Sequence, residues 1–119
     1  MPKKIDRVLD EFIKGVHQIL GNKVKKIILY GSYARGDYNK HSDIDIMILT
    51  DLTDYEIEKY RVKISDFAFD IELENDVMFS PLIKNLDKFN KRVDIIPFYM
   101  SVQKEGVVLN GWFYNRKFC

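Results

Sequence analysis

A glycine-serine pair and two aspartates carry the chemistry that this sequence suggests most clearly. Ten residues separate Gly31-Ser32 from Asp43-Ile44-Asp45, and an apolar segment ends just before Gly31. Aspartates two positions apart on a strand point to the same face, with stems about 6 to 7 Å apart, so both carboxylates can bind one cation. A glycine-serine turn offers N–H groups and a hydroxyl to anionic oxygens. A phosphate cradle beside a metal-binding carboxylate pair predicts phosphoryl or nucleotidyl transfer.

The two aspartates are the predicted metal ligands and catalytic residues. Asp43 and Asp45 are expected to hold Mg²⁺, with two ions in the full site, against the phosphates of a nucleotide. An isolated Asp-x-Asp is usually a solvated strand face. The glycine-serine pair at this distance favours the metal site instead.

Residues next to these motifs are candidates for nucleotide binding. Gly31 gives clearance for the terminal phosphates, and Ser32 offers its N–H and hydroxyl. Arg35 suits planar contacts with a phosphate or with a partner's carboxylate, but a solvated or structurally paired arginine is an equal alternative. Ser42, directly before Asp43, can reach the phosphates as well.

These motifs resemble the signature of the polymerase-beta-like nucleotidyltransferase superfamily, which is a glycine-serine turn, a spacer of this size and an Asp-x-Asp strand. The run from Gly31 to Asp37, with Ser42 before the first aspartate, resembles the small prokaryotic MNT-type minimal nucleotidyltransferases. The resemblance implies an α/β fold with a small mixed β-sheet flanked by helices. It also implies Mg²⁺-dependent transfer of AMP from ATP, and an antitoxin that adenylylates a tyrosine of a partner HEPN-domain toxin.

The resemblance further implies a third carboxylate on another strand. Asp76-Val77-Met78 falls where the family carries it, so Asp76 is the preferred third metal ligand and catalytic residue. The segment Ile71–Phe79 alternates well enough for a strand that would place Glu72, Glu74 and Asp76 on one face, which leaves Glu72 and Glu74 as alternatives. The segment from Val102 to Val107 resembles the family's closing helix and turn.

Hydrophobic periodicity and turn residues predict the elements that position the site. The expected elements are a helix over 3–20, a strand over 24–30, a short helical segment to Ala34, a strand over 43–48 with its isoleucines opposite the aspartates, a helix from the capping box Thr53/Glu56 to about Phe69, and a helix from Pro97 to Gly106 before a short extended tail. Pro81 is expected to end the third strand, and 82–92 to form a linker or short helix.

Composition sets limits on the class of protein. The 119 residues predict a single domain over 1–119, and 19 basic against 18 acidic residues argue against an extensive nucleic-acid surface. The single cysteine, Cys119, excludes an internal disulfide, and no apolar run approaches the roughly 18 residues of a membrane span. A cytoplasmic protein that forms a hetero-oligomer with its toxin, without a membrane, is expected.

Two other functions stay open on the sequence. One is a small-molecule nucleotidyltransferase subunit of the aminoglycoside-modifying kind, which would need a second chain to complete its acceptor pocket. The other is a binding-only antitoxin, which would not need the matched set Gly31, Ser32, Asp43, Asp45 and Asp76. Without additional helical domains, the acceptor is expected in an open groove that suits a protein substrate.

Overall fold

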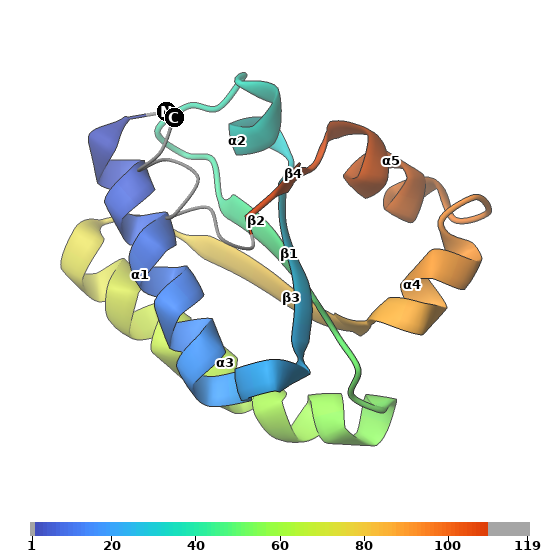
Figure 1. The fold of residues 1–119 in the computed structure, drawn as a ribbon. Helices are drawn as coiled ribbons and strands as arrows, with labels where there is room; N and C mark the ends of the chain where they lie inside the picture. The colour runs from blue at the N-terminus through green and yellow to red at the C-terminus, as the bar shows by residue number, and fades with distance from the viewer. Residues whose placement is uncertain (1, 110–119) are drawn as a thin grey trace, which may run out of the picture.

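A four-stranded mixed sheet between two helical layers forms the body of the protein in the computed structural model, which describes residues 2–109 (Figure 1). The elements in chain order are α1 (Lys3–Leu20), η1 (Gly21–Lys23), β1 (Val24–Tyr30), α2 (Ser32–Arg35), β2 (Ile44–Thr50), α3 (Asp54–Asn75), β3 (Phe79–Asn85), α4 (Leu86–Arg92), α5 (Pro97–Glu105) and β4 (Val107–Val108). The predicted α/β fold, a small mixed sheet flanked by helices, is confirmed.

The strand order brings distant parts of the sequence together at one end of the sheet. The sheet runs β3-β2-β1-β4, with β1 antiparallel to both β2 and β4, and β2 parallel to β3. Asp45 therefore lies between Tyr30 on β1 and Ser80 on β3. The end of β1 and the beginnings of β2 and β3 lie side by side at this end of the sheet.

The helices α1 and α3 cover one face of the sheet, on the left in Figure 1. Alternate residues of β1 and β2, such as Ile27 and Ile46, are fully buried beneath them. Gly15 lets the two helices approach closely, because a β-carbon there would lie 1.9 Å from the ring of Phe67. The main apolar core lies on this side, as the stripe on the first helix predicts.

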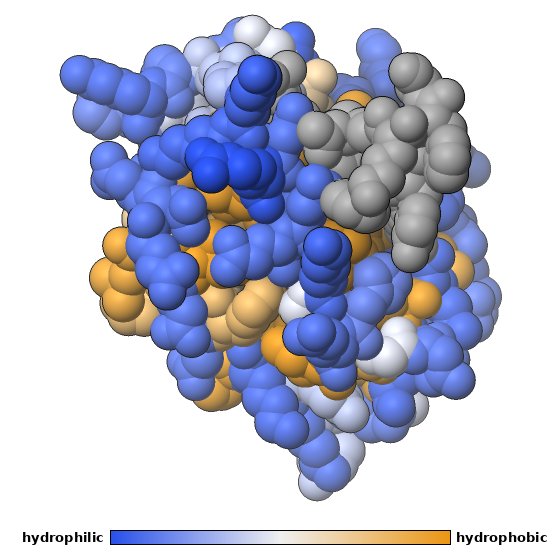
Figure 2. All heavy atoms as spheres, turned by 60° about the vertical axis from the view of Figure 1, so that its left-hand side comes forward, coloured by the Kyte–Doolittle hydropathy of each residue, from blue (hydrophilic) through white to orange (hydrophobic). Residues whose placement is uncertain are grey.

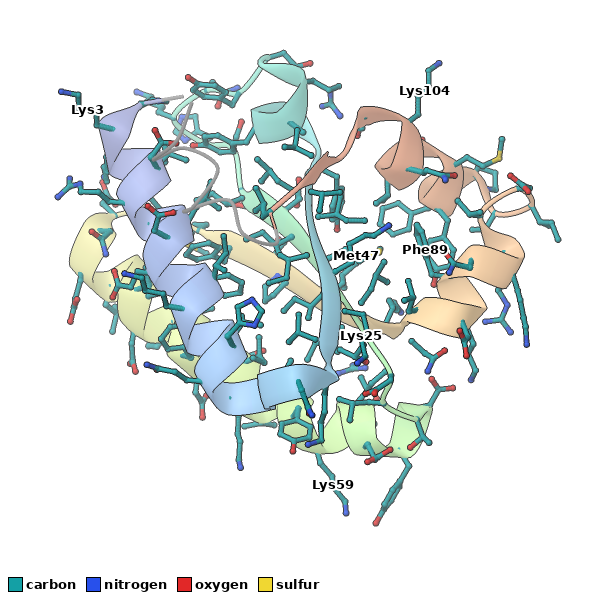
Figure 3. The ribbon with its side chains drawn as sticks, viewed as in Figure 1. Lys3, Lys25, Met47, Lys59, Phe89 and Lys104 are labelled. Carbon is teal, nitrogen blue, oxygen red and sulfur yellow. The ribbon has the colours of Figure 1, made fainter. Side chains whose placement is uncertain are left out.

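The helices α4 and α5 cover the opposite face, which also carries the aspartates. Met47 and Leu49 on β2 share that face with Asp45 and are fully buried with Phe89 of α4. Figure 3 shows Met47 and Phe89 in the layer between the sheet and these helices. The face of β2 that carries Asp45 therefore contributes to a second apolar core, and only the residues at the beginning of the strand are polar on this face.

The strand predicted over Ile71–Phe79 is wrong, because α3 continues to Asn75. Ile64, Ala68 and Ile71 are buried at spacings of four and three residues, which suits a helix as well as the short local alternation suits a strand. The third strand is Phe79–Asn85 instead, and Pro81 lies inside it. Proline is tolerated there because β3 is an edge strand.

The helix over 3–20, the strand over 24–30, the capping box of Thr53 and Glu56 that begins α3 and the proline that begins α5 are confirmed. Of the extended tail predicted after Gly106, β4 is confirmed, and the part beyond residue 109 lies outside the described residues. The segment predicted as a linker or short helix contains the end of β3 and α4. Figure 2 shows hydrophobic side chains reaching the surface between hydrophilic ones on the side that carries α1 and α3. Within residues 2–109, none of the helices has the length and apolar character that crossing a membrane requires.

Candidate active site

Gly31 connects the end of β1 to α2 in a conformation that favours glycine. Its φ is 74°, and a β-carbon on it would lie 2.2 Å from Oδ2 of Asp45. Its carbonyl oxygen accepts the N–H groups of Ala34 and Arg35, each at 3.0 Å. The absence of a side chain therefore lets the turn and the carboxylate pack against each other.

Asp43 and Asp45 lie at the beginning of β2, where the sheet meets solvent. Asp43 is exposed and its Oδ2 accepts the hydroxyl of Ser80 at 3.2 Å, whereas Asp45 is half-buried. Burial raises the pKa of Asp45, the charges of Asp43 and Glu105 raise it further, and the charge of Arg35 opposes them. Negative charge is crowded at this point, which favours a bound cation.

This donor set fits Mg²⁺. The ion is usually held by one or two carboxylates together with substrate phosphates and water. Within residues 2–109, no group of three or more histidine, cysteine, aspartate or glutamate side chains is arranged to hold a metal. Asp43 and Asp45 could therefore hold Mg²⁺ together with the oxygens of a nucleotide.

Tyr30 lies beside Asp45 on the neighbouring strand. Burial, followed by the charge of Asp45, raises the pKa of Tyr30 to about 12. Its ring packs edge-on against Phe98, with ring centroids 5.6 Å apart. Tyr30 is therefore a buried residue that lies between Asp45 and the ring of Phe98.

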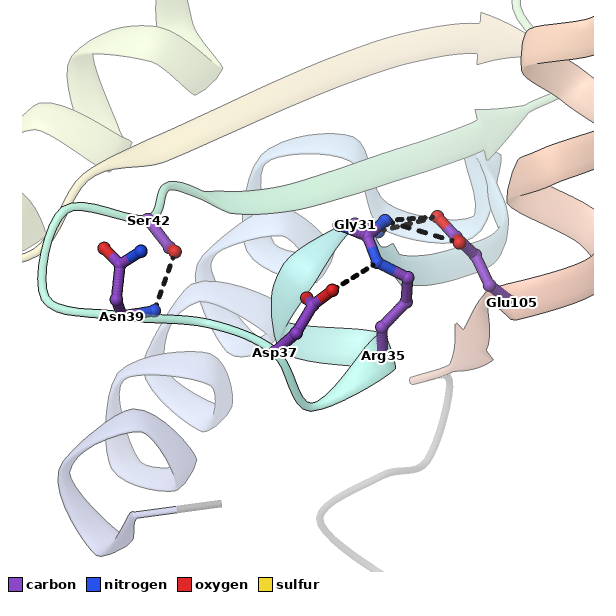
Figure 4. Close-up of polar contacts among 6 residues, drawn as sticks. All are labelled: Gly31, Arg35, Asp37, Asn39, Ser42 and Glu105. Atoms are coloured by element: carbon purple, nitrogen blue, oxygen red, sulfur yellow. Dashed lines mark hydrogen bonds and ion pairs between the residues drawn. The ribbon is translucent and has the colours of Figure 1, made fainter.

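Arg35 is paired with two carboxylates, and its side chain is 46% exposed. Its Nε donates to Oδ2 of Asp37 at 3.1 Å, and its Nη1 donates to Oε1 of Glu105 at 3.2 Å (Figure 4). Glu105 Oε1 also accepts the N–H of Gly31 at 3.2 Å. Sequence reasoning did not identify Glu105 as a site residue, although it lies in the segment that resembles the family's closing helix.

The two serines occupy different places. Ser32 begins α2 directly after Gly31 and is partly buried, so it lies at the predicted cradle. The hydroxyl of Ser42 accepts the N–H of Asn39 at 2.9 Å and so stabilises the loop before β2 (Figure 4). Its predicted contact with phosphate would have to compete with this bond.

The candidates for the third carboxylate do not lie on a strand. Glu72 and Glu74 lie on α3, and Asp76 is its C-cap in the left-handed conformation, with φ 53°. Glu72 accepts the N–H of Phe79 at 2.6 Å, which ties α3 to the beginning of β3. The prediction that Glu72, Glu74 and Asp76 lie on one face of a strand is therefore wrong.

Asp76 lies on a separate cavity, and the residue opposite Asp45 on β3 is Ser80. The cavity has a volume of about 430 Å³ and is lined by Tyr33, Lys40, His41, Ser42, Phe69, Glu72, Leu73, Asp76, Val77 and Met78. A catalytic role for Asp76 stays a prediction.

The chain is similar to known proteins over most of its length. The family model described as "Nucleotidyltransferase domain" matches residues 9–110. A Methanocaldococcus jannaschii protein with the name "Putative protein adenylyltransferase MJ0604" is 35% identical over 105 residues, which are 87% of this chain and 96% of that protein.

Two solved complexes share the fold. A crystal structure of a toxin-antitoxin with AMP-PNP matches with a TM-score of 0.51 at 19% identity, over 83% of this chain and 70% of that one. A tri-AMPylated Shewanella oneidensis HEPN toxin in complex with an MNT antitoxin matches with a TM-score of 0.50 at 18% identity, over 95% and 77%. At these identities the likeness concerns the fold alone.

Proposed function

Since this chain belongs to the nucleotidyltransferase domain family, we propose that it transfers AMP from ATP to a hydroxyl group with Mg²⁺ as cofactor. The observation that carries the proposal is the packing of the Asp45 carboxylate against the Gly31 turn, with Asp43 two residues away. A nucleotide whose phosphates lie in the turn would present them to both carboxylates. Bound Mg²⁺ would neutralise phosphate charge and lower the pKa of the attacking hydroxyl.

The residues of the chain have distinct roles in this reaction. Gly31 and Ser32 receive the phosphates, while Arg35 pairs with their negative charge. Asp43 and Asp45 hold the metal and align the α-phosphate. The acceptor oxygen forms a bond to the α-phosphorus, and its proton passes to water. The bond from the α-phosphorus to the oxygen between the α- and β-phosphates breaks, and pyrophosphate leaves.

The acceptor that we propose is a tyrosine of a HEPN-domain toxin, and the protein is its antitoxin in the cytoplasm. The name of the Methanocaldococcus jannaschii relative supports a protein acceptor. The structural likeness to an MNT antitoxin bound to an AMPylated HEPN toxin supports the class of partner. The likeness to a complex with AMP-PNP supports ATP as the donor.

The test is to incubate the protein with Mg²⁺, ATP and a HEPN-domain protein from the same genome, and then to measure intact masses. We expect the partner to gain one or more AMP units, and Asp43→Asn to lower the rate by at least about 100-fold with the fold retained. Asp51→Asn is the matched control, because Asp51 follows the same strand at its other end and pairs with Lys25 at 3.6 Å.

Three results would contradict this proposal. A partner that is bound and silenced without any gain in mass would favour an antitoxin that acts by binding alone. Transfer of AMP to an aminoglycoside in the absence of a partner would favour a small-molecule acceptor. Near-normal transfer by folded Asp43→Asn would show that the reaction does not depend on the carboxylate pair.

A further inference from the structure

Glu105, at the end of α5, connects three parts of the site. Its Oε1 accepts the N–H of Gly31 and the Nη1 of Arg35, and its Oε2 lies 3.4 Å from the same Nη1 (Figure 4). The Glu105 side chain is 26% exposed, whereas Asp37, the other carboxylate on Arg35, is 63% exposed. Glu105 is therefore the better shielded partner of the guanidinium, where a charge-assisted hydrogen bond is stronger.

The backbone after Glu105 fixes where this carboxylate reaches. A β-carbon on Gly106 would lie 2.3 Å from the carbonyl oxygen of Val102 and 2.4 Å from Cγ2 of Ile28. The next residue, Val107, pairs with Leu29 of β1. Close packing of the helix end on β1, rather than a free loop, thus presents Glu105 to the site.

The surrounding charges indicate what this connection does. The Asp45 carboxylate packs against Gly31, whose N–H donates to Glu105 and whose carbonyl oxygen accepts the N–H of Arg35, so the arginine and the glutamate are both attached to the turn beside that carboxylate. If Glu105 did not hold the guanidinium, Asp45 would be a nearby alternative partner. An ion pair between Arg35 and Asp45 would remove one metal ligand and one phosphate contact at the same time.

We propose that Glu105 is a positioning residue of the nucleotide site. It holds Arg35 and the N–H of Gly31 so that the guanidinium stays beside the phosphate cradle and off Asp45. This inference rests on the proposed function and adds the residue that sets the geometry of its phosphate contact. Glu105 acts through Arg35 and the Gly31 turn and does not itself bind the nucleotide.

The test measures binding of a non-hydrolysable ATP analogue with Mg²⁺ by calorimetry, together with kcat and KM for ATP. The full-length variants are Glu105→Ala, Glu105→Gln, Arg35→Ala and the double variant of Arg35→Ala with Glu105→Ala. Glu58→Gln is the control, because Glu58 pairs with Arg61 at 2.7 Å on the exposed surface of α3.

We expect Glu105→Ala to weaken binding by about tenfold, mainly through KM. Glu105→Gln retains an acceptor oxygen and should lose less affinity for the analogue than Glu105→Ala does. The double variant should lose less than the sum of the two single losses in binding free energy, because Glu105 acts in part through that arginine. Glu58→Gln should bind as the wild type does, and thermal melts establish that each variant is folded.

Three results would overturn the positioning role. Additive losses in the double variant would show that the two residues act independently, and unchanged binding by both Glu105 variants would show that the contact is incidental. Tighter binding by Glu105→Gln would show that the carboxylate competes with phosphate. If any of these results is found and the wild type still transfers AMP, the positioning role fails and the proposed function stands. If the wild type neither binds the analogue nor transfers AMP, both the positioning role and the proposed function fail.

Discussion

A β-carbon on Gly31 and the carboxylate of Asp45 cannot occupy their places together, since they would lie 2.2 Å apart. The turn after β1 and the carboxylate on β2 are therefore one packed unit, although 14 positions separate them in the sequence. A change in either element displaces the other. Such displacement is costly for catalysis, because a shift of about 1 Å at a reacting group can reduce the rate about 100-fold.

Gly31→Ala should therefore reduce AMP transfer on the order of 100-fold, because the methyl group pushes the Asp45 carboxylate away from the metal position. It should also lower the free energy of unfolding by about 1 to 3 kcal/mol, through overpacking and the positive φ. Initial rates and chemical unfolding measure the two effects.

Gly21→Ala is the matched control for that variant. Gly21 also has a positive φ, of 60°, but a β-carbon there meets no atom within 4 Å. Gly21→Ala therefore introduces backbone strain without a new contact, and it should lower the free energy of unfolding without affecting AMP transfer. Equal rates for the two variants would show that the contact with Asp45 is unimportant.

The raised pKa of Asp45 predicts a pH dependence of stability in metal-free buffer. Because folded Asp45 keeps its proton to higher pH than its ordinary value of 3.8, stability is lost as pH rises through that value and the raised folded one. The loss should persist at neutral pH and be absent in Asp45→Asn. Urea unfolding at a series of pH values measures it.

Asp43→Asn should show a smaller loss than the wild type over the same window, because the charge of Asp43 contributes to the raised pKa of Asp45. A wild type that instead gains stability relative to Asp45→Asn as pH rises would mean that the carboxylate is stabilised in its charged form. That outcome would contradict the crowding of negative charge at the site.

Glu72→Gln should reduce stability more than it reduces transfer. The Glu72 carboxylate accepts the N–H of Phe79 and so anchors the beginning of β3, and its replacement should cost about 1 kcal/mol. Glu74→Gln is the control, since Glu74 is exposed on the same helix. A stable Glu72→Gln that has lost transfer would restore Glu72 as a catalytic acid.

Asp76→Gly should raise the free energy of unfolding by about 0.5 to 1 kcal/mol, because glycine adopts the left-handed conformation at a helix end without a steric cost. Thermal and chemical unfolding measure the gain, and transfer assayed on the same sample tests the predicted catalytic role. A stabilised variant that transfers AMP at the normal rate would remove Asp76 from the site. If transfer is lost, Asp76 is the third acid.

The elements around the first motif were predictable because each carries its own local signal. The apolar stripe of α1, the buried strand before Gly31 and the alternating strand after Asp43 all follow from periodicity over short windows. The mixed sheet could be anticipated through the family resemblance. Neither inference needed a contact between residues far apart in the sequence.

The errors concern features that depend on such distant contacts. The end of α3 and the start of β3 are set by burial of Ile71 against the sheet and by the bond from Phe79 to Glu72. Proline marked a strand end in the sequence, yet Pro81 is accommodated because β3 is at the edge. Glu105 was missed because only the folded sheet brings it beside Gly31.

The tie between Glu105 and Gly31 spans 74 positions and is fixed by the pairing of β4 with β1. A ribosome makes β1, both aspartates and α3 well before it makes β4. A nascent chain that stops short of Val107 has the carboxylate pair but no strand to bring α5 onto β1. The phosphate-binding site therefore cannot be completed until β4 has been made.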